Sequence, residues 1–192
     1  LPPASDTGAS TSDRLTRLPT PQIEVTVNKR GRIEFDGTGD GLADVTQTNA
    51  APGTFAFAAG PFADGNNAVH ARFIPRFGDP VEAVLAIVVD TFGPRVLSVQ
   101  PNGLVNELVE HLDLTFDSAI DGGTFGVGDV RLVGPSVPAV DSIQRVAGNT
   151  WRVQLAAGLP VGAFTVEVGP DIGDLAGNPM NQDFFFKDAA PT

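Results

Sequence analysis

The chain lacks cysteine and tyrosine, and it has one methionine, one tryptophan and only 12 lysine and arginine residues among 192. Without cysteine it has no disulfides, no thiol catalysis and no cysteine-ligated zinc, so apolar cores, alone or with a hard metal ion, must hold the fold. Its 23 Asp and Glu residues give a formal net charge of −11, which disfavours nucleic acids and anionic membrane surfaces. No apolar run approaches the ~20 residues that span a bilayer. We therefore expect no nucleic-acid partner and no membrane insertion.

Glycine and proline are abundant, with 22 and 16 residues, and 42% of the residues are apolar against 18% charged. This composition is typical of a folded chain of short strands joined by turns. The length suits two domains of about 100 residues each. Because the sequence begins without a methionine or a signal-like segment, we expect it to be part of a longer polypeptide.

The stretch near the midpoint of the chain divides it in two. An apolar run at 86–89 ends in Asp90-Thr91, the chain is interrupted at Gly93-Pro94, and a new alternating apolar segment begins at once. Pro94 fixes its own φ and keeps the residue before it out of the helical region. The pattern predicts a short, stiff junction between two domains, 1–92 and 93–192.

Short alternating segments on both sides of this junction predict strands. Residues 22–28, for example, place Ile23, Val25 and Val27 on one face. Strands are expected at 22–28, 32–35, 43–48, 54–57, 68–74, 83–89, 95–99, 112–116, 130–133, 142–146, 150–155, 164–168 and 183–187. Residues 1–22 are rich in Pro, Ser, Thr and Asp and are expected to form a linker and a first loop, and a one-turn helix is expected around 123–128. About seven short strands per half, with frequent turns, predict an all-β chain of two β-sandwiches.

Several motifs resemble bacterial Ig-like repeats of large surface proteins. In the first half these are segments 5–8, 13–16 and 19–21, the segment 61–66 leading into the strand at 69–73, and 89–94, which resembles a Val-Asp-Thr-Thr-x-Pro exit. In the second half, 114–121 and 172–180 resemble the "T-F-S-x-x-I-D" and "I-x-D-x-A-G-N-P-M" segments of a different subtype. The resemblance implies two tandem Ig-like β-sandwich domains with a short Gly-Pro junction, in a secreted or cell-surface protein. It implies neighbouring Ig-like domains of the same polypeptide as partners, and no catalysis.

The loop at 36–44 is the sharpest candidate for a metal site. Its oxygen donors would come from Asp36, Thr38, Asp40, Leu42 (through its carbonyl) and Asp44. With Gly41 at the sixth position, this spacing suits Ca²⁺, which takes 6–8 oxygen ligands, and it resembles the calcium loops of integrin-type blades and dockerins. Gln47 stands where an EF-hand has its bidentate Glu, so we expect weaker affinity. The alternative is a glycine-rich turn in which Asp side chains bond to the backbone.

A second candidate set for calcium consists of Asp6, Asp13 and Asp90. The resemblance implies calcium at the seams between domains in some long adhesins, and Asp90 lies at such a seam, with Asp121 or Asp174 as further ligands. The alternative is that these residues cap turns without a metal.

No group of residues predicts catalysis. Asp6-Thr7-Gly8 spells an aspartic-protease tripeptide, but no apolar strand precedes it, and Phe92 interrupts the second copy. His70 and His111 are the only imidazoles, one per half, and His70 is expected on the solvent face of its strand. They build neither a Ser-His-Asp triad nor a metal-His cluster. We expect that the chain is not an enzyme.

The sequence thus predicts a structural, spacer or adhesive segment of an extracellular bacterial surface protein, stiffened by calcium if the ion binds. One alternative is a carbohydrate- or protein-binding accessory module of a secreted enzyme, although Trp151 alternates with Val153 and Leu155 and is expected in the core. The other is a self-assembling subunit of a surface layer or appendage. The expected further partners are a cell-surface or matrix ligand, or copies of the chain itself. The apolar run Phe184-Phe185-Phe186 is expected at a sheet edge or at a contact with a next domain.

Overall fold

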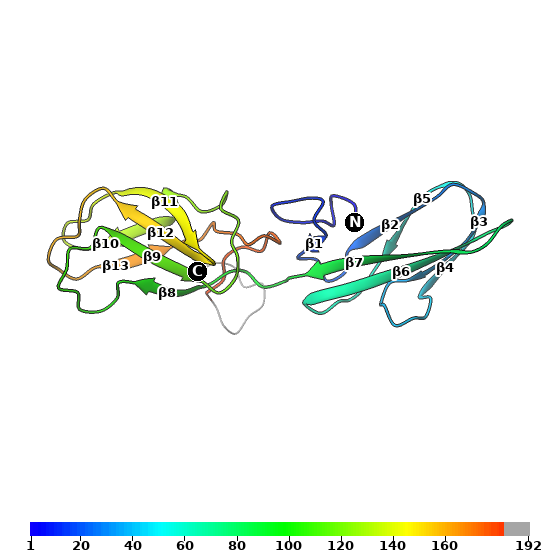
Figure 1. The fold of residues 1–192 in the computed structure, drawn as a ribbon, viewed down its shortest axis with the longest axis horizontal. Coiled ribbons are helices and arrows are strands. Elements are labelled where there is room, and N and C mark those ends of the chain that lie inside the picture. The colour runs from blue at the N-terminus through cyan, green and yellow to red at the C-terminus, as the bar shows by residue number, and fades with distance from the viewer. Residues whose placement is uncertain (183–192) are drawn as a thin grey trace. The chain divides into compact units, whose positions relative to one another are not determined.

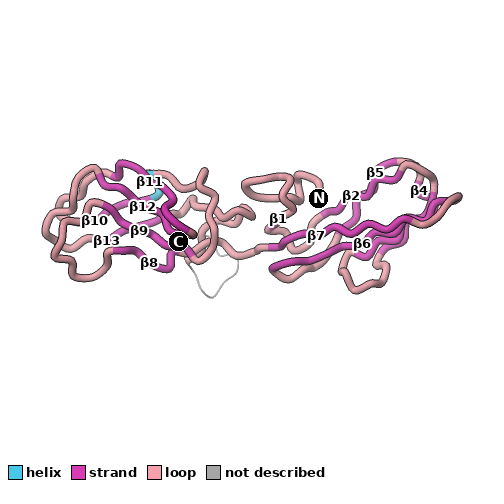
Figure 2. The backbone as a smooth tube through the Cα atoms, viewed as in Figure 1, coloured by secondary structure: helices cyan, strands magenta, loops and turns pink. Residues whose placement is uncertain are grey.

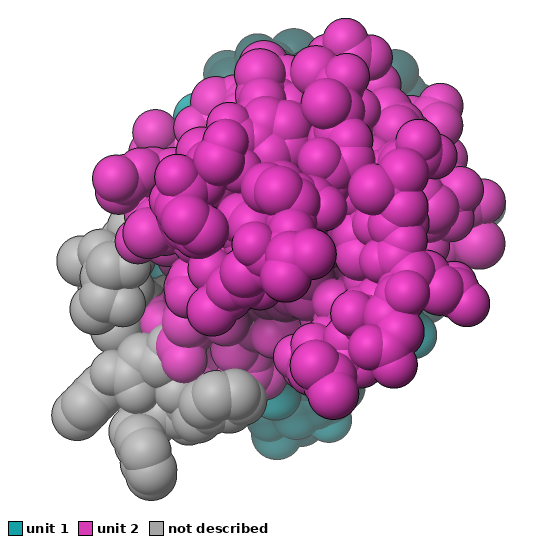
Figure 3. Space-filling view, turned by 90° about the vertical axis from the view of Figure 1, so that its left-hand side faces the viewer, with its two compact units in different colours: residues 1–91 teal, residues 92–192 magenta. Residues whose placement is uncertain are grey.

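The computed structural model describes residues 1–182, and the chain divides into two compact units, Leu1–Thr91 and Phe92 onward (Figures 1 and 3). The described residues are all-β, with a single 3₁₀ turn, η1 (Val127–Asp129), as their helical element (Figure 2). None of the described helical segments is long and apolar enough to cross a membrane. The strand expected at 183–187, with Phe184-Phe185-Phe186, lies outside the described residues.

The first unit contains two sheets. Its strands are β1 (Leu15–Thr16), β2 (Gln22–Val27), β3 (Gly31–Asp36), β4 (Val45–Ala50), β5 (Gly53–Ala58), β6 (Gly65–Pro75) and β7 (Val81–Val89). The larger sheet has the order β1-β7-β6-β3-β4, and the smaller one pairs β2 with β5. All neighbours are antiparallel except β1 and β7, which run parallel.

One apolar core lies between these two sheets. Alternation on β2 and β3 turns Ile23, Ile33 and Phe35 inward, where each is at most 3% exposed. Phe35 of the larger sheet stacks on Phe57 of the smaller one, with ring centroids 4.8 Å apart. The sheets therefore bury their facing sides against each other, an arrangement consistent with a β-sandwich.

The second unit also has two described sheets. Its strands are β8 (Val96–Gln100), β9 (His111–Phe116), β10 (Val130–Val133), β11 (Val140–Ala147), β12 (Thr150–Leu155) and β13 (Thr165–Val168). One sheet has the order β11-β12-β9-β8, and the other pairs β10 with β13. The segment Ala147-Gly148-Asn149 is a hairpin turn signal in the sequence, and a hairpin does join β11 to β12, with Gly148 supplying the positive φ of its turn, +50°.

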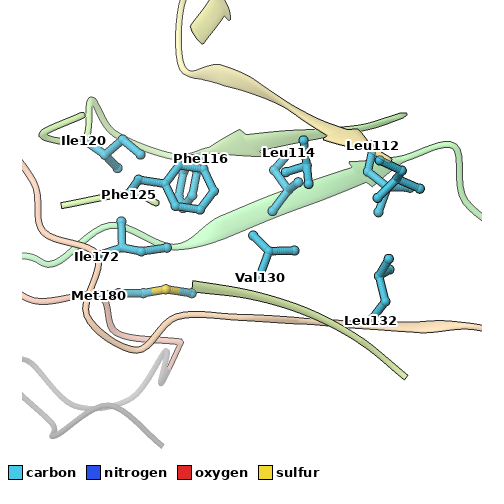
Figure 4. Close-up of a cluster of buried hydrophobic side chains, with 11 residues drawn as sticks. Leu112, Leu114, Phe116, Ile120, Phe125, Val130, Leu132, Ile172 and Met180 are labelled. Atoms are coloured by element: carbon cyan, nitrogen blue, oxygen red, sulfur yellow. The ribbon is translucent and has the colours of Figure 1, made fainter. Parts of the chain in front are cut away.

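The core of the second unit is apolar (Figure 4), and the partly buried Trp151 packs against it. Leu114 and Phe116 of β9 point towards Val130 of the other sheet, and Leu114 is fully buried. Phe125 makes edge-to-face contacts with Phe116 and Trp151, both at 5.6 Å between centroids. The prediction that Trp151 belongs to the core is confirmed.

The N-terminal segment differs from the prediction. Residues 1–22 were expected to be a linker and loop, but they contain β1 and three buried polar side chains, Ser5, Asp6 and Thr16. A two-residue strand shows no alternation in the sequence, and its partner β7 lies more than 70 positions away. The local pattern therefore gave no sign of the pairing that incorporates this segment into the first unit.

The two cores predict separable effects of large-to-small substitutions. Leu114→Ala should lower the free energy of unfolding of the second unit by about 2–5 kcal/mol, because it leaves a cavity at a fully buried site. Trp151 fluorescence during urea denaturation reports this unit alone. Ile33→Ala, the matched change in the first unit, should shift the circular-dichroism transition and leave the tryptophan transition in place. A tryptophan transition that moves equally with both variants would contradict two separate cores.

Candidate functional site

The loop that joins β3 to β4 is folded by its own carboxylates. The side chain of Asp36 accepts hydrogen bonds from the N–H groups of Gly39 at 2.6 Å and Gly41 at 2.8 Å. Asp44 Oδ2 accepts from the N–H groups of Gly37 at 2.8 Å and Thr38 at 3.0 Å. Gly39 and Gly41 have φ values of +75° and +87°, which glycine adopts without strain. These contacts form the compact turn that was the alternative to calcium in the sequence.

The electrostatics of Asp36 follow from these contacts. Burial raises the pKa of its carboxyl, but N–H donors from Gly41, Gly39 and Asp40, together with the charge of His70, lower the pKa below its ordinary value overall. His70 itself is exposed, as predicted. The ionised form of Asp36 is therefore the one that the folded loop stabilises.

The remaining donors of the proposed calcium loop are directed elsewhere. The Thr38 hydroxyl donates to Asp44, Asp40 Oδ1 accepts from the N–H of Leu42, and Asp40 and Leu42 are exposed. Within residues 1–182, no three His, Cys, Asp or Glu side chains come together in a group that fits a metal ion. The geometry favours the turn, and calcium binding at this loop stays a prediction.

The second set, Asp6, Asp13 and Asp90, belongs to the N-terminal segment and the end of the first unit. Asp6 is 2% exposed, and its Oδ2 accepts the N–H of Arg14, while its Oδ1 has no hydrogen-bond partner among the described atoms. Asp13 Oδ1 accepts the N–H of Leu15, and the N–H of Asp90 donates to the Thr16 carbonyl. Asp13 therefore caps the start of β1, and Asp6 is a buried carboxylate that holds the backbone at Arg14.

The two further carboxylates named with Asp90 close turns in the second unit. Asp121 Oδ1 accepts the N–H of Gly123, and Asp174 accepts both the N–H and the side-chain amide of Asn178, each at 2.8 Å. Asp174 and Asn178 are buried, so each satisfies the polar groups of the other. This contact gives a physical reason for the "D-x-A-G-N" spacing noted in the sequence.

Two polar contacts that the sequence did not single out hold the chain where it leaves the first unit and starts the second. Asp64 Oδ1 accepts the N–H of Thr91 at 2.9 Å and its hydroxyl at 2.8 Å. Asp117 accepts the N–H and the Nε–H of Arg95, each at 2.8 Å. Asp64 and Thr91 lie within two of the segments that carry the resemblance in the first half, 61–66 and 89–94, and this was the signal for them in the sequence.

A cross-strand ion pair on the four-stranded sheet was also missed. Arg152 of β12 lies opposite Asp113 of β9 and donates to both its carboxylate oxygens at 2.8 Å. The side-chain hydrogen bond from Arg152 lowers the pKa of Asp113. Alternation in the sequence places Arg152 on the face opposite Trp151, as an ordinary exposed strand position, and it does not identify the residue that lies beside Arg152 on the next strand.

The turn at Asp36 predicts a pH-dependent loss of stability. Because its folded-state pKa is lowered, Asp36 contributes stability above its unfolded pKa of about 3.9, and the contribution is lost as the pH falls through the folded pKa. Asp36→Asn should destabilise the first unit at pH 7 by about 1–3 kcal/mol, and the difference from wild type should shrink below about pH 4. Urea unfolding at a series of pH values measures it. The matched Asp40→Asn should change the free energy of unfolding by less than about 0.5 kcal/mol. Equal effects of the two variants would contradict the role of the Asp36 carboxylate in stabilising the turn.

Calcium is tested by thermal unfolding with excess CaCl₂ and with excess EDTA. We expect the same melting temperature in both, because the carboxylates of the loop already bind backbone N–H groups. If calcium raises the melting temperature and Asp40→Asn removes that rise, the ion binds in the loop at 36–44. A rise that only Asp90→Asn removes would place it at the second set.

Comparison with known proteins leaves the family of the chain open. The chain matches no protein-family model, no curated protein and no solved structure. The resemblance to bacterial Ig-like repeats therefore stays a prediction from sequence motifs. Any conclusion on function rests on the strand geometry and the contacts described above.

Proposed function

We propose that the chain is a non-catalytic, tension-bearing spacer or adhesive segment of an extracellular bacterial surface protein. The observation that carries the proposal is the position of the first and last strands of the first unit. β1 and β7 are neighbours in one sheet and run parallel, with Leu15 opposite Val88 and Thr16 opposite Val89. This arrangement determines the direction in which a pulling force loads the hydrogen bonds between the two strands.

Tension on the two ends of the unit acts along these strands in opposite directions. β1 is pulled towards its N-terminus and β7 towards its C-terminus, so the hydrogen bonds between them are loaded together, in shear. Two strands that ran antiparallel and were pulled at the same end would instead separate one bond at a time. The loaded bonds include the N–H of Val88 to the Arg14 carbonyl and the N–H of Asp90 to the Thr16 carbonyl, both 2.9 Å.

Side-chain contacts reinforce both ends. On the exit side, Asp64 holds Thr91 through two hydrogen bonds. On the N-terminal side, the Ser5 hydroxyl accepts the N–H of Gln22 and the Thr7 hydroxyl accepts the N–H of Arg17. A chain without disulfides needs contacts of this kind if its ends are to withstand load.

The strand order supports the Ig-like part of the proposal. In the second unit, β11-β12-β9-β8 and β10-β13 correspond to the D-E-B-A and C-F neighbours of a constant-type Ig sandwich. In the first unit, β7-β6-β3-β4 and β2-β5 correspond to G-F-C-C′ and B-E, with β1 beside the last strand. The extracellular bacterial setting is supported by the sequence motifs and by the acidic composition.

The accessory-module alternative finds little support in these contacts. A sugar-binding face needs an exposed aromatic strip, and Trp151 packs on Phe125 in the core instead. One observation favours self-assembly between copies: the edge of β7 opposite β6 is open over most of its length.

The proposal predicts that the first unit resists force differently along two directions. Because the chain has no cysteine, paired cysteines define the points of attachment in optical tweezers. Leu1→Cys with Phe92→Cys loads β1 and β7 in shear, whereas Ala63→Cys with Phe92→Cys opens the β6–β7 pair from one end. We expect a several-fold higher unfolding force for the first pair. Equal forces in the two directions would remove the tension-bearing role.

A further inference from the structure

We propose that the exposed edge of β7 pairs, antiparallel and about a two-fold axis, with β7 of a second copy of the chain. The inference does not depend on the tension-bearing role, since association and unfolding force are measured separately. It identifies a protein-protein interface on the first unit and assigns its occupant. β7 has an open edge, an apolar surface beside that edge, and one register in which two copies fit.

The edge is open because β1 is short. β1 pairs with β7 at Val88 and Val89 only, and among the described residues no strand lies beside 81–87 on the side opposite β6. The N–H of Val88 points to this edge, where it bonds to the Arg14 carbonyl. Main-chain groups alternate along a strand, so the N–H and C=O groups of Glu82, Val84 and Ala86 face the same open edge. Unpaired edge groups of this kind are a template for another strand.

The surface beside this edge is apolar. The solvent face of β7 carries Glu82, Val84, Ala86 and Val88, and the side chain of Val84 is 63% exposed. Glu82 is its single charge, and Arg72 on β6 is within 3.4 Å of that carboxylate. The nine residue pairs between β6 and β7 show no register shift, so no bulge turns this edge away.

Several other described edges carry a bulge, a polar run or charges, whereas β5 (Gly53–Ala58) has none of these and β7 has the single charge of Glu82. β4, at the opposite edge of the same sheet, is polar over 46–49 and has a register shift against β3. The outer strands of the four-stranded sheet, β8 and β11, also have register shifts. β2 presents Glu24, and β10 and β13 present the ion pair of Arg131 and Glu167. Bulges and charges are the usual devices that prevent strand pairing.

One register satisfies the edge completely. With the axis at Val84, this residue faces Val84 of the second copy and Glu82 faces Ala86, so every free edge residue exchanges hydrogen bonds, about six in all. An axis at Glu82 places two carboxylates opposite each other. An axis at Ala83 places Ala86 opposite Pro80, which has no N–H, and an axis at Leu85 requires the N–H of Val88 that Arg14 already uses.

Sedimentation equilibrium of the full chain, from micromolar to millimolar concentration, tests the interface. We expect a monomer-dimer equilibrium that shifts towards dimer as salt is added, because each copy has a net charge of −11 and salt screens the repulsion. Val84→Lys should abolish the dimer. The matched Thr48→Lys, an exposed change on the β4 edge, should leave it intact. A wild-type chain that stays monomeric throughout, or a dimer that both variants disrupt equally, would overturn the proposal.

Single-cysteine variants test the register under mild oxidation. In the proposed pair, the two copies of residue 84 are about 5.5 Å apart between Cα atoms, within the range of a disulfide. Val84→Cys should therefore cross-link to a covalent dimer. The two copies of residue 86 are about 14 Å apart, so Ala86→Cys alone should not cross-link, whereas its mixture with Glu82→Cys should. Equal cross-linking of Val84→Cys and Ala86→Cys would contradict this register.

Discussion

The fold depends on the burial of two separate apolar layers by a chain that has no covalent cross-link. Each unit places the inner faces of two sheets against each other, with Phe35 on Phe57 in the first and Leu114 facing Val130 in the second. Such a core stabilises the middle of a sandwich, and its ends must be closed by other means. In the first unit the ends are closed by hydrogen bonds, through the pairing of β1 with β7 and the contact of Asp64 with Thr91.

Many of the acidic side chains stabilise turns and strand ends by accepting hydrogen bonds from the backbone. Asp36, Asp64 and Asp174 each accept at least one main-chain N–H at a turn or strand end, where the backbone has no strand partner. A carboxylate accepts strong hydrogen bonds and donates none, so it suits turns in which several N–H groups converge. Part of the negative charge therefore serves to order loops, which gives a reason for calcium-like spacing in a chain whose residues 1–182 contain no group of three side chains that fits a metal ion.

The sequence predicted the elements that depend on local patterns. Apart from β1, alternation located the strands in the first 182 residues to within a few positions, because most strands turn alternate apolar residues towards a core. The turn signal at Gly148 marked the hairpin between β11 and β12. Alternation predicted Trp151 in the core for the same reason. Local sequence patterns did not reveal which distant segments pair with each other. β1, the opposition of Arg152 to Asp113 and the contact of Asp64 with Thr91 each join residues that only the folded topology brings together.

The candidate site shows the same limit. The spacing of oxygen side chains at 36–44 is compatible with an ion and with a turn, because both need oxygen atoms directed into the loop. The ion site and the turn differ in the direction in which each carboxylate points. The spacing of the residues along the chain does not determine that direction. In the structure Asp36 and Asp44 direct oxygens at the N–H groups of several loop residues, while the carboxylate of Asp40 accepts the N–H of its near neighbour Leu42.

The short length of β1 links the two proposed properties of the first unit. A longer β1 would add shear-loaded bonds to β7 and would also cover the edge at 82–86. With β1 confined to Leu15–Thr16, β7 is held in shear by few bonds and keeps an open side. A second copy on that side would add main-chain bonds along the same loaded strand. Lateral pairing would therefore strengthen the strand on which the tension acts, and a chain that uses one property gains from the other.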